Sequence, residues 1–256
     1  MATPILADIV PLLNLPRGKD VYTYALPLEY AGDSGKLVTI PFRARTVKGI
    51  LWNISPSEQE QKFTPKTVAS IGKQILTHGQ RALIERCCSI LGGSRATLSK
   101  LWVKHQLVLP STIEERSSSS SVERCITGPT TEIFEELGAQ FQRADAHSQH
   151  LVLAPTKEIA QQIETALRAE CPNALILLAH SGERPSTFTT LLGRLESPNN
   201  QPVVVVATHM GLFLPWRRLT SIFVVDEHHT AHRQWDSEPR IDNRMVARWL
   251  AEYWGA

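Results

Sequence analysis

The chain has 256 residues, of which 42% are hydrophobic and 20% are charged. These fractions are typical of globular domains and exclude a collagen-like repeat, a coiled coil and a largely disordered chain. No apolar run approaches the roughly 18 residues that a membrane-spanning helix needs, so no membrane partner is expected.

The formal net charge of +2 is unevenly distributed along the chain. Residues 1–116 carry 15 basic and 9 acidic residues, whereas residues 117–256 carry 12 basic and 16 acidic ones, so the net charges are +6 and −4. A basic segment favours a polyanionic partner, because Lys and Arg release counterions from phosphates. A solvated basic surface explains the same charges equally well.

Residues 1–70 are predicted to be β-rich. Short runs of Val, Ile, Tyr and Thr alternate with turn-forming Gly, Pro and Asp residues, and this pattern indicates a small barrel or sandwich. The polar residues 55–66 are expected to form a loop. The expected strands are residues 5–13, 20–25, 36–40 and 46–52.

The pattern becomes helical in residues 71–116. Helices are expected at residues 81–91 and 96–105, separated by a glycine pair, with Ser94 as the N-cap of the second helix. A short strand is expected at residues 107–109. Two helices and a strand fit a winged-helix or helix-turn-helix unit, and a generic helical linker fits equally well.

A run of serines within residues 117–123 is typical of a flexible linker. Beyond it, residues 124–256 alternate between apolar strands and amphipathic helices, which indicates an α/β lobe with a parallel sheet covered on both faces. The expected strands are residues 151–154, 174–179, 203–207 and 222–225, and the expected helices are residues 133–142, 156–169 and 186–195.

The sharpest local motif is IFVVDEHH, residues 222–229. An apolar strand that ends in Asp226 and Glu227 places both carboxylates at the carboxyl edge of the sheet, where α/β folds hold ligands. There an Asp can orient Mg²⁺ and a Glu can activate water. A solvated strand end is the competing interpretation.

Metal chemistry of another kind is not expected. The histidines at positions 228, 229 and 232 lack a nearby Cys or further acidic ligand at suitable spacing, so zinc is not predicted. The four cysteines show no CxxC spacing, which indicates a reduced, cytoplasmic chain.

The wider sequence resembles the primosomal protein N′ (PriA) family of replication-restart DNA helicases. VVVVATHMGLFLPWRRLTSIFVVDEHH, residues 203–229, is similar to the family's apolar strand, G-T-R-S-A-L-F-x-P and I-V-V-D-E-E-H segments. Residues 7–27 and 36–52 are similar to its V-x-L-P-x-x-x-F-D/T-Y-x-x-P and V-x-V-P-F-G-x-R-x-x-x-G-I-V patterns. The resemblance implies a 3′-end DNA-binding domain followed by a RecA-like P-loop lobe of superfamily 2.

In the family, the N-terminal domain holds the 3′ end of the nascent leading strand at a stalled fork. The resemblance places the DNA-binding positions at Tyr22, Thr23, Tyr24, Arg43 and Lys66. Aromatic rings can stack on bases, hydroxyls can reach a terminal sugar, and basic side chains can contact phosphate. The competing interpretation is that the two tyrosines are ordinary strand aromatics, spaced by two residues on one face.

Two of these positions depart from the family. Arg43 stands where the family prefers Gly, and Thr23 stands where Asp is common. The resemblance therefore implies that a carboxylate acceptor for a 3′-hydroxyl is missing, although the Thr23 hydroxyl can still accept a hydrogen bond.

The nucleotide site departs further. The family's Walker A loop, G-x-T-G-S-G-K-T-E, aligns with RCITGPTTE at residues 124–132, which places Thr130 at the lysine and Pro129 at a glycine. The loop cradles phosphate with backbone N–H groups and a lysine charge, and this sequence loses one donor and that charge. The resemblance implies ATP and Mg²⁺, with Thr131 and Asp226 left as ligands of the ion, but tight nucleotide binding is not expected.

The resemblance thus implies a PriA-like DNA-binding protein of replication restart and primosome assembly that recognises forked or 3′-ended DNA. His209, in place of the family's Arg, and His229 are implied as coupling residues. The chain ends at Ala256, before the family's zinc-binding insertion and second lobe, so a truncated, impaired ATPase lobe without zinc is expected. Primosome or single-stranded DNA-binding proteins are the expected partners. An active ATP-dependent 3′-to-5′ helicase that needs a second lobe, and a non-catalytic primosome scaffold, are the alternatives.

Overall fold

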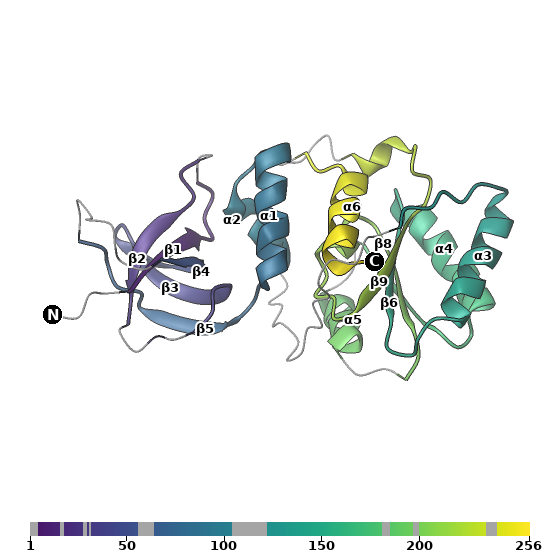
Figure 1. Ribbon diagram of the computed structural model, residues 1–256, viewed down its shortest axis with the longest axis horizontal. Coiled ribbons are helices and arrows are strands. Elements are labelled where there is room, and N and C mark those ends of the chain that lie inside the picture. Colours follow the sequence, from purple (N-terminus) through teal and green to yellow (C-terminus); the bar gives the residue numbers. More distant parts are fainter. Residues whose placement is uncertain are drawn as a thin grey trace. The chain divides into compact units, whose positions relative to one another are not determined.

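The computed structural model forms two compact units, Met1–Leu109 and Pro110–Ala256, which are described separately (Figure 1). The predicted serine linker and the strand at residues 107–109 lie outside the described residues. The structure describes residues 5–15, 18–27, 30, 32–55, 64–103, 122–180, 185–196, 200–233 and 240–256.

The first unit contains a five-stranded antiparallel sheet in the order β2-β1-β4-β3-β5. This confirms the β-rich region that the sequence predicts, and it adds β5, whose polar sequence SIGKQ has no alternating pattern. The strands are β1 (Ile5–Pro11), β2 (Tyr22–Leu26), β3 (Lys36–Phe42), β4 (Arg45–Ser55) and β5 (Ser70–Gln74).

The sheet curls so that β2 and β3 face each other, although they are not neighbours in the sheet. The Tyr24 hydroxyl donates to the Pro41 carbonyl at 3.0 Å, and the rings of Tyr22 and Phe42 meet edge to face with centroids 5.1 Å apart. At the edge of the sheet, Ala25 forms an isolated parallel bridge with Thr67, just before β5. The enclosed core consists of Ala7, Ile9, Tyr24, Leu26, Val38, Ile40, Leu51 and Val68.

Helices α1 (His78–Leu91) and α2 (Arg95–Val103) belong to the same unit as this sheet. A capping box at Thr77 starts α1 three residues earlier than the apolar spacing predicts. The predicted N-cap of α2 is confirmed, because the Ser94 hydroxyl accepts from the Thr97 amide at 3.1 Å.

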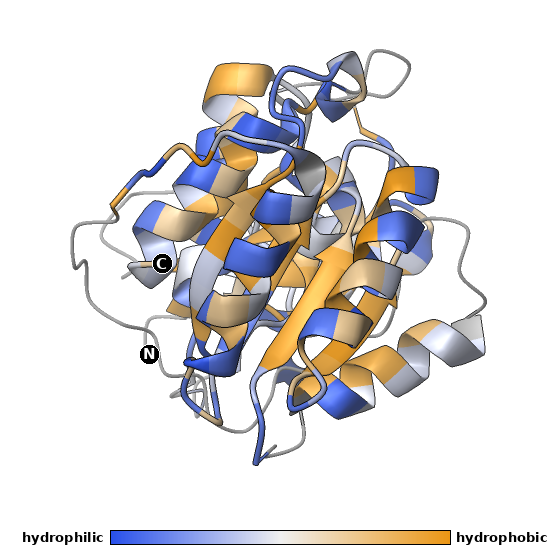
Figure 2. Cartoon of the chain, turned by 90° about the vertical axis from the view of Figure 1, so that its right-hand side faces the viewer, coloured by the Kyte–Doolittle hydropathy of each residue, from blue (hydrophilic) through white to orange (hydrophobic). Residues whose placement is uncertain are grey.

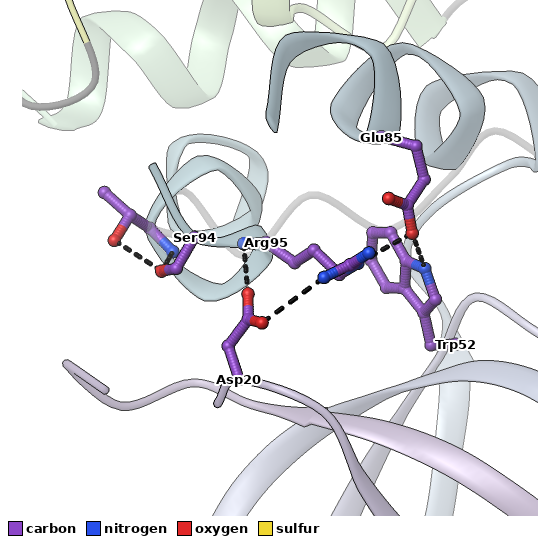
Figure 3. A network of polar contacts seen from close by, with 6 residues as sticks. Asp20, Trp52, Glu85, Ser94 and Arg95 are labelled. Carbon is purple, nitrogen blue, oxygen red and sulfur yellow. Dashed lines mark hydrogen bonds and ion pairs between the residues drawn. The ribbon is translucent and has the colours of Figure 1, made fainter. Parts of the chain in front are cut away.

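A partly buried polar network joins these helices to the sheet (Figure 3). The Asp20 carboxylate, 2% exposed, accepts from the Arg95 backbone amide at 2.6 Å and lies 3.3 Å from its guanidinium. The Glu85 carboxylate accepts from the other side of that guanidinium at 2.7 Å and from the Trp52 indole at 2.6 Å. The helices and strand β4 are therefore fixed to each other through charged hydrogen bonds.

The second unit is the predicted α/β region with a parallel sheet, in the order β7-β8-β6-β9. In Figure 2 the central strands are orange, whereas the surrounding helices alternate blue and orange. The strands are β6 (Gln149–Leu153), β7 (Leu175–Ala179), β8 (Val203–Ala207) and β9 (Leu219–Val224). The helices are α3 (Thr130–Gln142), α4 (Lys157–Glu170), α5 (Pro185–Glu196) and α6 (Asn243–Trp254), with short 3-10 turns η1 (His209–Phe213) and η2 (Thr230–His232).

Helix α6 is absent from the sequence prediction. Its apolar residues do recur at helical spacing, and Asp242 caps its first turn by accepting from the Arg244 amide at 3.1 Å. No helix in the described part of the chain is long and apolar enough to cross a membrane. The four cysteines all lie in that part and form no disulfide.

Candidate nucleic-acid interface

Strand β2 carries three of the predicted DNA-binding residues, and it turns them to two different faces. Tyr22 and Tyr24 point into the curled sheet, whereas Thr23 between them points to the opposite face. Strand β2 is the first strand in the order of the sheet. A ligand that passes around this edge can therefore contact both faces of β2.

Tyr24 is a core residue. Its side chain is 5% exposed and its hydroxyl is already donated to Pro41. Burial, with a smaller contribution from Tyr22, raises the pKa of the Tyr24 phenol. Tyr24 therefore occupies the position expected of an ordinary strand aromatic. A contact between Tyr24 and DNA stays a prediction.

Tyr22 and Arg43 meet through a third side chain, Phe42. Tyr22 is half-buried and packs edge-on against Phe42, and the Arg43 guanidinium lies over the same ring at 5.8 Å from its centroid. Arg43 is the first residue of the two-residue turn between β3 and β4 and has a φ of 54°. The turn therefore holds an exposed cation beside two aromatic rings at one rim of the curled sheet.

Lys66 lies next to β2 through a backbone contact. Its carbonyl accepts from the Ala25 amide at 2.9 Å, and the Val68 amide donates to the Ala25 carbonyl at 3.0 Å. The parallel bridge thereby fixes an exposed lysine next to the strand that carries the tyrosines. Residues from three separate segments of the sequence are brought together around β2.

Thr23 has a carboxylate partner that the sequence does not reveal. Asp8 of β1 lies directly opposite Thr23 in the ladder, and the Thr23 hydroxyl donates to its Oδ1 at 3.3 Å. The β1–β4 register shifts between Asp8 and Ile9, and Asp8 faces Asn53 of β4 on its other side. A polar row of three side chains thus crosses three neighbouring strands at a β-bulge.

In the second unit, Asp226 and Glu227 follow β9 at the carboxyl edge of the parallel sheet, as the sequence predicts. Both are exposed, and Asp226 has a φ of 47°. The Arg244 guanidinium donates to the Glu227 carbonyl at 2.9 Å and to both oxygens of Asp242. The hydrogen bonds that Asp242 accepts from Arg244, together with one from Arg233, lower the pKa of Asp242 to about 2. The acidic turn is therefore held by α6.

The two predicted coupling histidines lie at the same edge. His209 opens η1 after β8, and burial lowers the pKa of its imidazole. His229 caps η2, where its Nδ1 accepts from the Ala231 amide at 3.1 Å. His232 is fully buried and its Nε2 lies 2.9 Å from the Val225 carbonyl. Within the described residues no three metal-ligating side chains come together.

The position of the predicted phosphate-binding segment, residues 124–132, follows from the direction of helix α3. The rings of Phe141 and His150 lie 5.0 Å apart, so the C-terminal end of α3 is at the amino end of β6. The first turn, with Thr130 and Thr131, therefore lies toward the edge where β9 ends. Residues 122–129 form no strand or helix, and Pro129 caps α3 without a side-chain hydrogen bond.

Comparison with known proteins finds a family model that is similar to most of the first unit. Residues 11–93 match the family model of the PriA 3′ DNA-binding domain, 3′BD. The chain is also 23% identical over 239 residues to the replication restart protein PriA of Rickettsia conorii, a match that covers 83% of this chain. The chain spans 36% of that relative's length.

The resemblance to PriA that the sequence predicts is thus confirmed. The matched segment contains Tyr22, Arg43 and Lys66 and extends through α1, beyond the predicted boundary at residue 70. Sequence reasoning missed Phe42 and Asp8. Phe42 could have been found from its place beside the turn, whereas Asp8 precedes the segment matched to PriA and is recognised only from the strand register.

The residues at positions 124–131 do not fit the triphosphate group that the PriA resemblance implies. A phosphate loop joins a strand to a helix and needs consecutive backbone N–H donors and a cation. Here Pro129 supplies no N–H at the helix start. Thr130, in the lysine position, brings no charge.

Proposed function

We propose that the first unit binds the 3′ end of DNA at forked structures, in replication restart and primosome assembly. The observation that carries this proposal is the gathering of Tyr22, Arg43 and Lys66 around edge strand β2, within the segment that matches the PriA 3′ DNA-binding domain. The curled sheet acts as a small barrel whose rim receives the DNA end.

Each of the three side chains offers a different contact. The half-buried ring of Tyr22 provides a stacking face for a terminal base, because Phe42 fixes it edge-on. Arg43 and Lys66 are exposed cations on separate segments, so they can contact successive phosphates and make binding salt-dependent. The net charge of +6 in residues 1–116 adds a field that attracts DNA to this unit.

The second unit is proposed to be a RecA-like lobe with little nucleotide affinity. Its support is the parallel sheet that ends in Asp226 and Glu227, together with a segment at 124–131 that lacks a phosphate cradle. A primosome scaffold remains the second candidate, because unit 2 presents the acidic turn at an exposed edge. The two proposals differ in whether unit 1 binds DNA.

The test is fluorescence anisotropy of a labelled fork with a recessed 3′ end, at two salt concentrations. Changing Arg43→Ala or Lys66→Ala is expected to weaken binding about fivefold each and to reduce the salt slope by about one. Lys73→Ala is the matched control, since Lys73 is an exposed lysine on β5, beyond the bridge that joins Thr67 to Ala25 of β2.

Equal losses in all three variants would reduce the proposal to a nonspecific basic surface. No binding at either salt concentration would contradict it and would favour the scaffold.

A further inference from the structure

The parallel sheet of the second unit has two edge strands, β7 and β9, and the edge of β7 is protected. The Leu175 amide and the Ala179 carbonyl bond to residues that flank β8, so Ile176, whose backbone has the opposite orientation, directs its carbonyl away from the sheet. The Arg168 guanidinium of α4 donates to that carbonyl at 2.8 Å. A charged side chain on an edge strand hinders pairing with a further strand.

The edge of β9 differs from that of β7. The Val225 amide donates to the Leu153 carbonyl at 3.0 Å, and the register aligns Val224 with Leu153 and Ile222 with Leu151 of β6. Because the orientation alternates along a strand, Ile222 and Val224 direct their N–H and C=O groups away from β6. Among the described residues, no strand pairs with β9 on this side and no side chain hydrogen-bonds to these groups. We call the backbone of Ile222 and Val224 the open edge of β9.

Helices cover both faces of β9 and leave this edge as the part available for pairing. Phe223 packs edge to face against Phe141 of α3, with ring centroids 5.4 Å apart, and α6 packs against β9 on the opposite side of the sheet (Figure 1). Residues 122–129, which precede α3, form no strand. Their Glu123 and Arg124 instead form ion pairs with α6 and α3. The described part of the chain therefore supplies no strand of its own to the open edge.

The charges at the two ends of β9 are complementary to each other. Arg217 and Arg218 precede the strand, and Asp226 and Glu227 follow its end. In an antiparallel ladder of two copies that is centred on Ile222, Arg218 lies opposite Asp226 and Arg217 lies opposite Glu227. A twofold axis repeats each pair, so both ends of the ladder join opposite charges. A parallel ladder of two copies would instead bring like charges together.

We propose that the open edge of β9 pairs with the open edge of a second copy of this chain, antiparallel and across a twofold axis. The N–H and C=O groups of Ile222 then exchange hydrogen bonds with those of Ile222 in the second copy, and the two parallel sheets become one continuous sheet. This surface uses only residues of the second unit, so it goes beyond the DNA binding proposed for the first unit and is tested independently of it.

Sedimentation velocity of the whole chain tests the proposal. A short interface of this kind is expected to dissociate at about 10 µM, so monomer should convert to dimer as the concentration rises through this range. Arg217→Glu and Glu227→Arg are each expected to weaken the dimer about tenfold, since each change brings like charges together twice. Mixing the two variants should restore a dimer, because opposite charges then meet at both ends of the ladder.

Glu170→Arg is the matched control for the charge variants. It makes the same change of charge at an exposed position of α4, which packs against β7 and β8, and it should leave the dimer unchanged.

Ile222→Pro probes the backbone ladder itself. The Ile222 N–H points away from β6, so proline removes no hydrogen bond from the sheet but blocks pairing at the centre of the dimer. Leu178→Pro is its control, because the Leu178 N–H points outward in the same way at the protected edge of β7.

Two results of the charge experiment would overturn the proposal. One is a chain that stays monomeric at about 100 µM, tenfold above the expected dissociation constant. The other is a mixture of Arg217→Glu and Glu227→Arg that forms no dimer. A dimer of unchanged strength in Ile222→Pro, with the fold verified by circular dichroism, would also overturn it, because the contact would then lie elsewhere.

Discussion

The two units place their candidate sites by different means. In the first unit, Tyr22, Arg43 and Lys66 are far apart in sequence, and sheet pairing and the curl of the strands place all three around β2. In the second unit, Asp226 and Glu227 are consecutive, follow the end of one strand, β9, and are held there by Arg244 of α6. The first site therefore forms only when the whole unit is folded. The residues of the second site are consecutive and belong to one short motif, residues 222–229.

A shared detail makes this contrast sharper. The described residues contain two non-glycine positions with positive φ, Arg43 and Asp226, and each directly follows, or nearly follows, a strand at the candidate site of its unit. Left-handed backbone is unfavourable for residues with a Cβ and is concentrated at functional positions. In both units, the unfavourable backbone conformation occurs at a charged residue that follows a strand.

The largest expected effect is a difference between the two units in how their stability depends on pH. His150 is buried in the second unit between Ser148 and Ser221, and burial lowers the pKa of its imidazole to about 4. A base whose folded pKa lies below its unfolded value stabilises the fold above the unfolded pKa, near 6.5, and loses that contribution as the pH falls toward 4. The second unit should therefore lose about 3 kcal/mol between pH 7 and pH 4.

Urea unfolding with hydrogen-exchange readout on each unit measures this loss. His150→Gln should reduce the pH dependence of the second unit and leave that of the first unchanged, and the smaller part that remains is expected from His209 and His232, whose pKa values burial also lowers. A pH dependence that persists undiminished in the variant would assign the acid sensitivity to other groups.

The sequence predicts the second unit better than the first for a physical reason. Buried parallel strands such as VVVVA at 203–207 are apolar on both faces, so the strand, its edge and the following Asp226 can all be identified locally. By contrast, the partner of Thr23 depends on the register between β1 and β2, which no local pattern fixes. Helix α6 is not predicted, although its N-cap Asp242 and its apolar residues at helical spacing are both present in the sequence.

The next effect tests whether the helices and the sheet of the first unit are one cooperative structure. Asp20→Ala removes the acceptor of the Arg95 amide and one side of its guanidinium pairing. The expected destabilisation is about 2 kcal/mol, combining the loss of a helix cap with a broken, mostly buried ion pair. Hydrogen exchange in α2 and β4 should accelerate, while exchange in α6 should not. Asp33→Ala serves as the exposed control, and equal effects of both changes would argue against the network.

The smallest effect addresses the strained positions themselves. Arg43→Ala and Arg43→Gly both remove the guanidinium, so they should weaken DNA binding equally. Only the alanine keeps a Cβ at a φ of 54°, so the glycine variant should be more stable by about 1 kcal/mol. The same pair of changes at Asp226 should give the same difference in the second unit.

Urea midpoints of the four variants measure both differences within one experiment. The comparison cancels the lost side-chain contacts at each position, because alanine and glycine lose them alike, and it leaves the backbone term. Equal stabilities of the alanine and glycine variants at Arg43 would show that this turn carries no strain.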